Sequence, residues 1–132
     1  MGLLKRIFGI CETKPPSDAR CWRYSGGKVE IQLERAAELS NRGGAIRLEG
    51  RELPERVLIL NGDDGNFHAF KNKCTHMGRR IDPVDGHGAV QCCSLSKSTF
   101  NYTGEMISGP AKGPLTSFKV ESEDGKLIIL IE

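Results

Sequence analysis

Residues 73–78 read Lys73-Cys74-Thr75-His76-Met77-Gly78, and residues 92–100 read C-C-S-L-S-K-S-T-F. A thiolate and an imidazole two positions apart on one loop are both good ligands for transition metals. A second loop that carries cysteine can approach the same centre from the opposite side. The two stretches therefore predict one small metal centre gripped between two loops, with the rest of the chain organised around them.

Composition and short apolar runs favour one all-β domain. The chain has 132 residues, enough for one compact domain, with 16 glycines, 38% apolar and 27% charged residues. Val29 to Leu33 alternates apolar and polar side chains, as a strand with one buried face does. Further strands are predicted at 45–49, 56–60 and 67–70, with a helical turn or two at 34–39 and a turn at 61–66. Short strands at this spacing predict an antiparallel sandwich or barrel.

The first twenty residues differ from the rest of the chain. An apolar stripe with helical spacing lies beside two basic residues: Leu3, Leu4, Ile7 and Phe8, next to Lys5 and Arg6. Met1–Ile10 can therefore contact a membrane surface, a partner's groove or its own domain, but it is far too short to span a bilayer. Because Pro15-Pro16 fixes an extended backbone, we expect an amphipathic segment and linker at 1–20 and the ordered domain at 21–132.

Five cysteines, at positions 11, 21, 74, 92 and 93, do not form an even disulfide framework, and the chain does not start with a secretory signal. We therefore expect a reducing, cytoplasmic location. Cys11 and Cys21, ten residues apart, can add to a metal site, but they are interpreted as buried or incidental thiols, because neither belongs to a C-x-x-C arrangement.

The two loops and the residues that follow them resemble the Rieske family of iron–sulfur domains. Residues 74–78 have its C-x-H-x-G form, and residues 98–105, S-T-F-N-Y-T-G-E, are one residue short of its S-x-F-D-x-x-T-G-E. Residues 109–115, G-P-A-K-G-P-L, match its proline loop, and residues 118–131 its last hairpin. The resemblance runs from about Val29 to Glu132. It implies an antiparallel sandwich or barrel with a small subdomain, at about 72–110, of two cluster-binding loops and a proline loop.

The resemblance also implies a [2Fe–2S] cluster, to which each loop gives one Cys and one His. Cys74, His76 and Cys93 take three of the four ligand positions, and Ser96 stands where the second His belongs. Lys97 replaces a Gly that lets the backbone approach the cluster, which suggests a different loop path. High-potential members carry an extra Cys in each loop, and Arg79 and Leu95 at those places indicate the ferredoxin-like branch.

The fourth ligand position stays open. Ser96 can bind iron through its alkoxide, or Cys92 can turn inward in its place. Successive residues of a strand point to opposite faces, so Cys92 and Cys93 can both face the metal only where the backbone is irregular. Alternatively the cluster is absent, and Cys74, His76 and Cys93 are remnants or hold a single zinc or iron. His68, on a predicted strand, and His87, in a Gly-rich turn, are interpreted as structural.

Charge bears on the partner more than on the fold. The formal net charge is +2, which does not call for nucleic acid, but Lys71, Lys73, Arg79 and Arg80 surround the first loop without an acid among them. They form either a solvated surface or a docking patch for an acidic redox protein.

The leading hypothesis is an electron-transfer protein or subunit that passes single electrons to or from a larger redox enzyme, without independent catalysis. The alternative is a cluster-free Rieske-fold module that serves a redox complex structurally. A small mononuclear metal protein is a third possibility.

Overall fold

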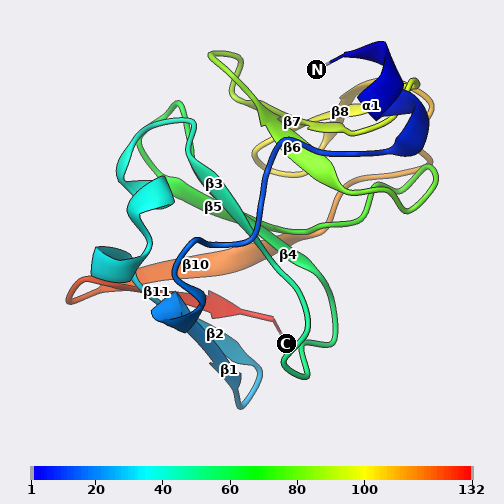
Figure 1. Ribbon diagram of the computed structural model, residues 1–132. Helices are drawn as coiled ribbons and strands as arrows, with labels where there is room; N and C mark the ends of the chain where they lie inside the picture. The colour runs from blue at the N-terminus through cyan, green and yellow to red at the C-terminus, as the bar shows by residue number, and fades with distance from the viewer. Residues whose placement is uncertain (1, 132) are drawn as a thin grey trace.

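A computed structural model describes residues 2–131, which form two antiparallel sheets joined end to end (Figure 1). The larger sheet has seven strands in the order β1-β2-β11-β10-β5-β4-β3, and the smaller has four in the order β6-β7-β8-β9. Helical content is minimal, so the prediction of an all-β fold is confirmed. Met1, the first residue of the predicted amphipathic segment, lies outside the described residues.

The strands and helices have the following bounds. The larger sheet comprises β1 (Trp22–Ser25), β2 (Lys28–Gln32), β3 (Ala45–Leu48), β4 (Val57–Asn61), β5 (Phe67–Lys71), β10 (Ser117–Glu123) and β11 (Lys126–Leu130). The smaller sheet comprises β6 (Ile81–Val84), β7 (Ala89–Cys92), β8 (Thr99–Asn101) and β9 (Met106–Ser108). The helices are α1 (Leu3–Phe8) and the 3-10 turns η1 (Ala19–Cys21), η2 (Leu33–Arg35) and η3 (Ala37–Ser40).

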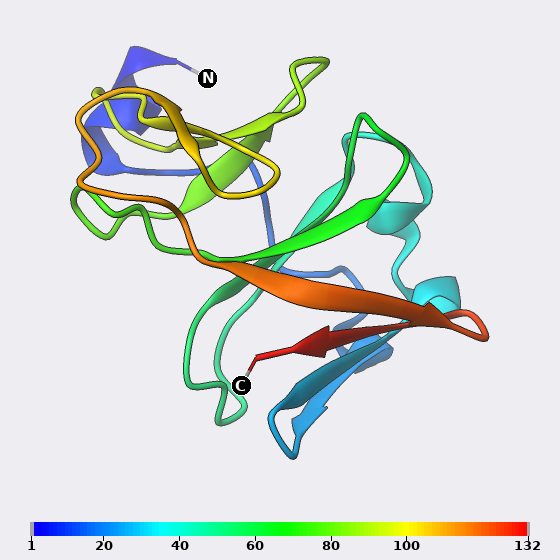
Figure 2. The ribbon, with the colours of Figure 1, turned by 180° about the vertical axis from the view of Figure 1, so that it is seen from behind.

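Alternating side chains build the core of the larger sheet. In β2, Val29 and Ile31 are fully buried while their neighbours are not, as the sequence pattern predicts. Ile31 lies opposite Leu127 of β11 in the register, so the two strands present their apolar faces to the same side. Figure 2 shows the final hairpin, β10–β11, curling back beside β2 to close this half of the molecule.

Strand β4 separates two hydrophobic cores. Its residues Val57, Leu58, Ile59 and Leu60 are all fully buried. Val57 and Ile59 belong to the core of the larger sheet, whereas Leu58 and Leu60 belong to a second core under the smaller sheet. The second core also contains Cys74 and Cys92, together with Phe70 and Phe100. Strand β4 is therefore apolar on both faces, and Cys74 and Cys92 pack in the core on one of these faces.

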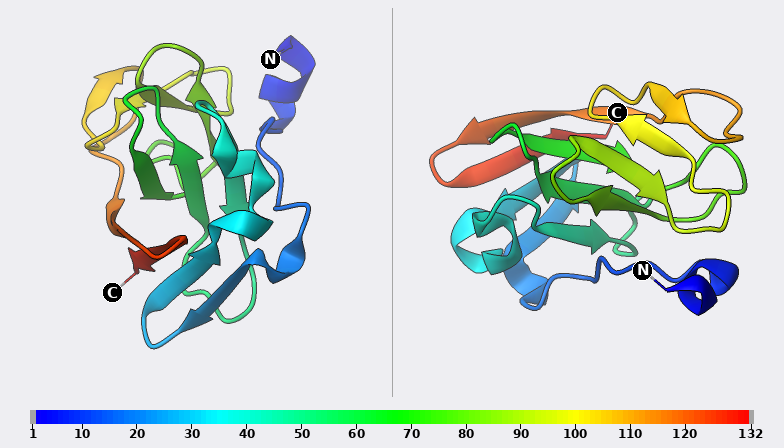
Figure 3. Two further views of the ribbon diagram at one scale, coloured as in Figure 1. Left: turned by 90° about the vertical axis from the view of Figure 1, so that its left-hand side faces the viewer. Right: turned by 90° about the horizontal axis from the view of Figure 1, so that it is seen from above.

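The N-terminal segment runs along the domain and is bonded to it. The backbone carbonyl of Lys14 accepts a hydrogen bond from the amide of Arg47 at 3.1 Å. The carboxylate of Asp82 accepts from the amides of Glu12 and Thr13 at 2.7 and 2.9 Å. Proline at 15 and 16 keeps the backbone extended as expected, but the extended segment forms hydrogen bonds with the sheets. Figure 3 shows it crossing from α1 toward η1 along one side of the molecule.

Helix α1 packs with its polar side inward. Leu3, Leu4, Ile7 and Phe8 are exposed, while Arg6 is partly buried and holds the helix to the domain. Its guanidinium donates to the side-chain oxygen of Gln91 at 2.9 Å and to the carbonyl of Ser94 at 3.2 Å. Among residues 2–131, no helix has the length and apolar character needed to cross a bilayer.

The proline loop, residues 109–115, gives a sharp test of the fold. Gly109 has a φ of 100°, and a Cβ there would lie 2.5 Å from the Cα of Ser98. We predict that Gly109→Ala lowers the free energy of unfolding by about 2–3 kcal/mol, because the backbone conformation is strained for Ala and the contact is with backbone. The measurement is urea unfolding followed by circular dichroism.

Gly113→Ala in the same loop is the control, since a Cβ on Gly113 meets no atom within 4 Å. We expect it to change the unfolding free energy by less than about 0.5 kcal/mol. Equal effects of the two substitutions would contradict the close packing of Gly109 on Ser98.

Candidate metal centre

The first loop, between β5 and β6, is fixed by two buried or partly buried side chains. Asn72 is buried, and its Oδ1 accepts a hydrogen bond from the amide of Ile81 at 2.8 Å. Arg56 donates to the carbonyls of Asn72 and Gly78 at 3.0 and 2.7 Å. The amide of Gly78 donates to the carbonyl of Cys74 at 2.9 Å, which closes the turn. Cys74 and His76 therefore lie on a loop that is held at both ends.

The second loop follows β7 and is fixed by backbone hydrogen bonds. The amide of Cys92 donates to the carbonyl of Ser98 at 2.8 Å, and the amide of Cys93 donates to the carbonyl of Arg80 at 3.0 Å. The second bond ties the two loops together. Lys97 has a φ of 53°, the left-handed conformation that glycine adopts most easily. The turn therefore keeps a glycine-type backbone conformation with a lysine in it.

The proline loop covers the first loop. The hydroxyl of Thr75 donates to the carbonyl of Gly113 at 2.7 Å, and Ala111 and Leu115 are buried. With Gly109 against Ser98, three loops that are distant in sequence converge on one end of the molecule.

Cys74 and Cys92 are the free thiols at this convergence. Both are almost fully buried, and Cys74 lies near enough to Cys92 to influence its pKa. Burial raises the pKa of the Cys92 thiol to about 11, and the neighbouring Cys74 raises it as well, while the Ser94 hydroxyl and the positive charge of Arg79 lower it. The amide of His76 also lies 3.4 Å from the sulfur of Cys74. Two thiols packed this closely in an apolar site are ready to bind a cation once deprotonated.

Two buried side-chain atoms of these loops have no hydrogen-bond partner. Within residues 2–131, four buried side-chain polar atoms lack a hydrogen-bond partner, and two of them, Nδ1 of His76 and Oγ of Ser98, belong to these loops. An unpaired buried imidazole nitrogen is costly in a folded protein, and a neutral imidazole nitrogen is a common metal ligand. Cys74, Cys92 and His76 thus supply donor types that transition metals bind.

The hydroxyls of Ser94 and Ser96 form a chain of hydrogen bonds that starts at the thiol of Cys92. The sulfur of Cys92 lies 3.2 Å from Oγ of Ser94, which lies 2.7 Å from Oγ of Ser96. Ser96, the predicted replacement for the missing His, is therefore two contacts away from the buried thiols. The sequence patterns did not predict a role for Ser94. Its position, two residues after Cys92 on a turn, is the feature from which it could have been predicted.

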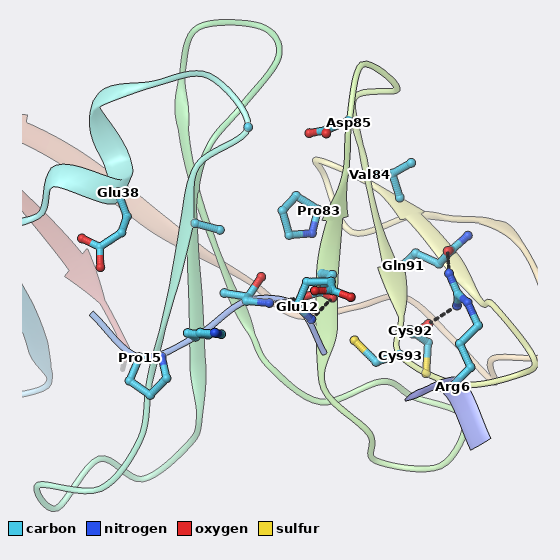
Figure 4. Close-up of a pocket in the computed structure, with 15 residues that line it drawn as sticks. Arg6, Glu12, Pro15, Glu38, Pro83, Val84, Asp85, Gln91, Cys92 and Cys93 are labelled. Carbon is cyan, nitrogen blue, oxygen red and sulfur yellow. Dashed lines mark hydrogen bonds between the residues drawn. The ribbon is translucent and has the colours of Figure 1, made fainter. Parts of the chain in front are cut away.

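Cys93 lies on the opposite side of the second loop from the site. Its sulfur is bonded to that of Cys11, with the two Cα atoms 5.4 Å apart. Figure 4 shows the sulfurs of Cys92 and Cys93 pointing in different directions. The prediction of Cys93 as a ligand does not agree with this geometry, and neither does the interpretation of Cys11 as an incidental thiol. The physical reason is the alternation of side chains at the end of a strand, which lets one of two adjacent cysteines face the second core.

The remaining histidines have the structural roles expected of them. Nε2 of His68 lies 2.9 Å from a carboxylate oxygen of Asp64, and the ring stacks on Tyr102 with 4.2 Å between centroids. His87 lies in the turn between β6 and β7.

The basic residues around the first loop divide into two pairs. Arg80 forms a two-point ion pair with Glu49 at 2.6 and 2.8 Å, and Lys71 pairs with Glu55 at 3.4 Å. Lys73 and Arg79 form no ion pair with any residue in the range 2–131. The charge that remains available near the site is therefore that of Lys73 and Arg79.

Comparisons with known proteins identify sequences and structures similar to this chain. The profile of the Rieske [2Fe-2S] domain family matches residues 30–119. The cytochrome b6-f complex iron-sulfur subunit of Chlorobaculum tepidum is 33% identical over 103 residues, covering 77% of this chain and 54% of that protein. The methanesulfonate monooxygenase ferredoxin subunit of Methylosulfonomonas methylovora is 31% identical over 80 residues, covering 58% of this chain and 62% of that protein. The chain thus spans about half the length of the first relative.

Solved structures show the same fold. The ferredoxin of carbazole 1,9a-dioxygenase from Nocardioides aromaticivorans has a TM-score of 0.61 at 16% identity, covering 78% of this chain and 98% of that one. A complex of oxygenase and ferredoxin in carbazole 1,9a-dioxygenase contains a chain with a TM-score of 0.65 at 21% identity, covering 82% of this chain and 96% of that one.

The ion pair between Arg80 and Glu49 predicts a pH dependence of stability. The hydrogen bond from Arg80 holds the pKa of Glu49 below its ordinary value, so the pair stabilises the fold above that value and is lost as pH falls through the lowered pKa. We expect Glu49→Gln to reduce the unfolding free energy by about 0.5–1 kcal/mol at pH 7, and the difference to shrink as the pH falls through the lowered pKa of Glu49. Urea unfolding at several pH values measures it.

Glu55→Gln, at the more exposed pair with Lys71, is the matched control and should show a smaller effect. A Glu49→Gln effect that is the same at every pH would contradict the assigned role of the carboxylate charge.

Proposed function

Because the chain belongs to the Rieske [2Fe–2S] domain family, we propose that it is an electron-transfer protein or subunit that passes single electrons to or from a larger redox enzyme. The observation that carries the proposal is the convergence of two buried thiols, Cys74 and Cys92, with the unpaired buried Nδ1 of His76. Relatives that are named ferredoxin subunits of a monooxygenase and of a dioxygenase support this function.

The chain's own residues would hold the cofactor as follows. Cys74 and Cys92 would hold one iron through their thiolates, while Nδ1 of His76 and a serine hydroxyl would hold the other. Cys92 replaces Cys93 in this assignment because the sulfur of Cys93 is bonded to Cys11. Ser96 is the proposed fourth ligand, and Ser94 positions it through their 2.7 Å hydrogen bond. When bound, the [2Fe–2S] cluster supplies a one-electron redox couple.

The protein around the site limits contact with water. Cys74 and Cys92 are buried, and the proline loop lies over the first loop through the hydrogen bond of Thr75. Backbone amides near the thiols, such as that of His76, stabilise thiolate charge. A cluster-free structural subunit is the second candidate, because Ser96 stands where family members carry a His.

Iron, zinc and acid-labile sulfide analysis on protein purified without air tests the proposal. We predict two irons and two sulfides per chain, a red-brown colour and a low average g-value in the EPR spectrum of the reduced protein. Colourless protein without sulfide would support the cluster-free subunit, and zinc or one iron without sulfide would support a mononuclear site.

Substitutions then identify the ligands. Cys92→Ala should abolish the cluster, whereas Cys93→Ala should retain it, since only the first removes a thiol that faces Cys74. Ser96→Ala should change the EPR g-values, while Ser94→Ala, the matched neighbour, should change them less. Loss of the cluster with Cys93→Ala and its retention with Cys92→Ala would reverse the assignment.

The partner would dock at the end of the molecule that carries the loops. Met77 and Leu95 are exposed on the first and second loops, and Lys73 and Arg79 lie beside them. Exposed apolar residues within a basic surround fit a partner with an apolar centre and acidic rim. Helix α1 extends this surface, because Arg6 binds the second loop while the apolar side chains face outward. We propose that segment 1–20 is an accessory docking element of domain 21–132.

Salt dependence tests this docking. We predict that Lys73→Ala with Arg79→Ala slows electron exchange with a plant-type ferredoxin, chosen as an acidic probe, by about threefold to tenfold at low salt and little at high salt. Stopped-flow absorbance at several ionic strengths measures the rate. Lys28→Ala with Lys119→Ala, on β2 and β10, is the control. Equal rates for all variants at every ionic strength would remove the basic residues from the docking surface.

We propose the cytoplasm as the location of the protein. Cytoplasmic thiols are kept largely reduced by glutathione and thioredoxin. The Cys11–Cys93 disulfide is then one of two states of that cysteine pair.

A further inference from the structure

We propose that Cys11, Cys93 and Asp82 form a second metal site, which binds a divalent cation of the zinc class when the disulfide is reduced. Their ligand atoms, two Sγ and one carboxylate oxygen, all lie within 4.8 Å of one another. The site is independent of the proposed electron-transfer function, because none of these three side chains belongs to the set formed by Cys74, Cys92 and His76.

The donors suit a borderline divalent cation. Two thiolates and a carboxylate are usual zinc ligands, with Zn–S distances of about 2.3 Å and a tetrahedral arrangement. Sulfurs in such a site lie roughly 3.8 Å apart, so the two sulfurs need only separate by the breaking of their bond. Cα atoms 5.4 Å apart allow both states with little movement of the backbone.

Asp82 is held in place for a ligand role. It is 9% exposed and, within the described part of the chain, it forms no ion pair. One carboxylate oxygen accepts from the amide of Glu12 and the other from the amide of Thr13, which fixes the plane of the carboxylate. Each oxygen retains a further lone pair for a cation. Hydrogen bonds of this kind orient metal ligands in known sites.

A cavity gives the site access to solvent. Asp82 and Cys93 line a cavity of about 590 Å³, together with Glu12 and Gln91. Figure 4 shows Cys92 and Cys93 among the residues that line it, with their sulfurs pointing in different directions. Water can occupy the fourth coordination position, and a reductant and a metal ion can approach Cys93 and Asp82 by the same route.

The chemical step is a thiol–disulfide exchange followed by metal binding. A thiolate of a dithiol reductant attacks one sulfur of the Cys11–Cys93 bond, and its second thiolate then resolves the mixed disulfide. The dithiol becomes a disulfide, and Cys11 and Cys93 gain two electrons and two protons. The cation displaces the two protons as it binds the thiolates. The N-terminal segment is therefore tied to the residue after β7 by a disulfide in one state, and to that residue and Asp82 of β6 by a metal in the other.

Cobalt binding to the full chain tests the site, since Co²⁺ bound by thiolates absorbs in the near ultraviolet. Wild-type protein reduced with dithiothreitol, and freed of it by gel filtration under argon, should bind one Co²⁺ per chain more than reduced Cys11→Ser. Diamide oxidation of the wild type should remove that equivalent. Both proteins share the residues of the first centre, so any Co²⁺ bound there cancels in the comparison.

Asp82→Asn provides a second variant that keeps both thiols. It should bind Co²⁺ at least about tenfold more weakly, with the absorption of the two thiolates retained. Equal Co²⁺ stoichiometry in reduced wild type and Cys11→Ser would overturn the proposal. A disulfide that dithiothreitol fails to open would overturn it as well, because the site then never forms.

Discussion

The alternation of side chains at the end of β7 is the constraint on which the site depends. Cys92 and Cys93 are adjacent, and the strand directs their side chains to opposite sides. One thiol joins the second core beside Cys74, and the other meets Cys11 of the N-terminal segment. A shift of one residue in the register of β7 with β6 and β8 would exchange these roles. The backbone bonds from Cys92 to Ser98 and from Cys93 to Arg80 oppose that shift.

Burial at β4 supplies the apolar surroundings of the thiols. Leu58 and Leu60 form part of the same core as Cys74 and Cys92, while the other face of the strand completes the core of the larger sheet. Because both faces of β4 are packed, Leu58 and Leu60, which lie against the thiols, belong to a close-packed interior. The loops above it are fixed by specific polar contacts, such as the buried one of Asn72 and the partly buried ones of Arg56. A rigid site suits electron transfer, since little reorganisation accompanies a change of charge.

The sequence predicted the fold well where local patterns decide it. Alternation at Val29 to Leu33 matched β2, and the stripe from Leu3 to Phe8 matched α1. Cys74 and His76 are predicted as ligands because a C-x-H spacing on one loop has a direct chemical meaning. For the second loop, family spacing points to Cys93, whereas in the structure Cys92 faces the second core and Cys93 is bonded to Cys11. The Cys11–Cys93 pair joins residues 82 positions apart, and no local pattern carries that information.

Helix α1 packs with its polar side toward the domain, and Arg6 attaches it to β7 and to the second loop. A six-residue helix is not stable alone in water, and this one has no buried apolar residue to hold it. Its attachment rests on Arg6, whose acceptors are Gln91 of β7 and the carbonyls of Cys92 and Ser94. The same backbone carries the proposed iron ligand Cys92 and, one residue on, the sulfur that ties the segment down through Cys11. A partner that covers the apolar side of α1 therefore contacts a helix that is hydrogen-bonded to the second loop. The disulfide between Cys11 and Cys93 is a second, covalent attachment of the same segment to that loop, and its reduction would leave the hydrogen bonds of Arg6.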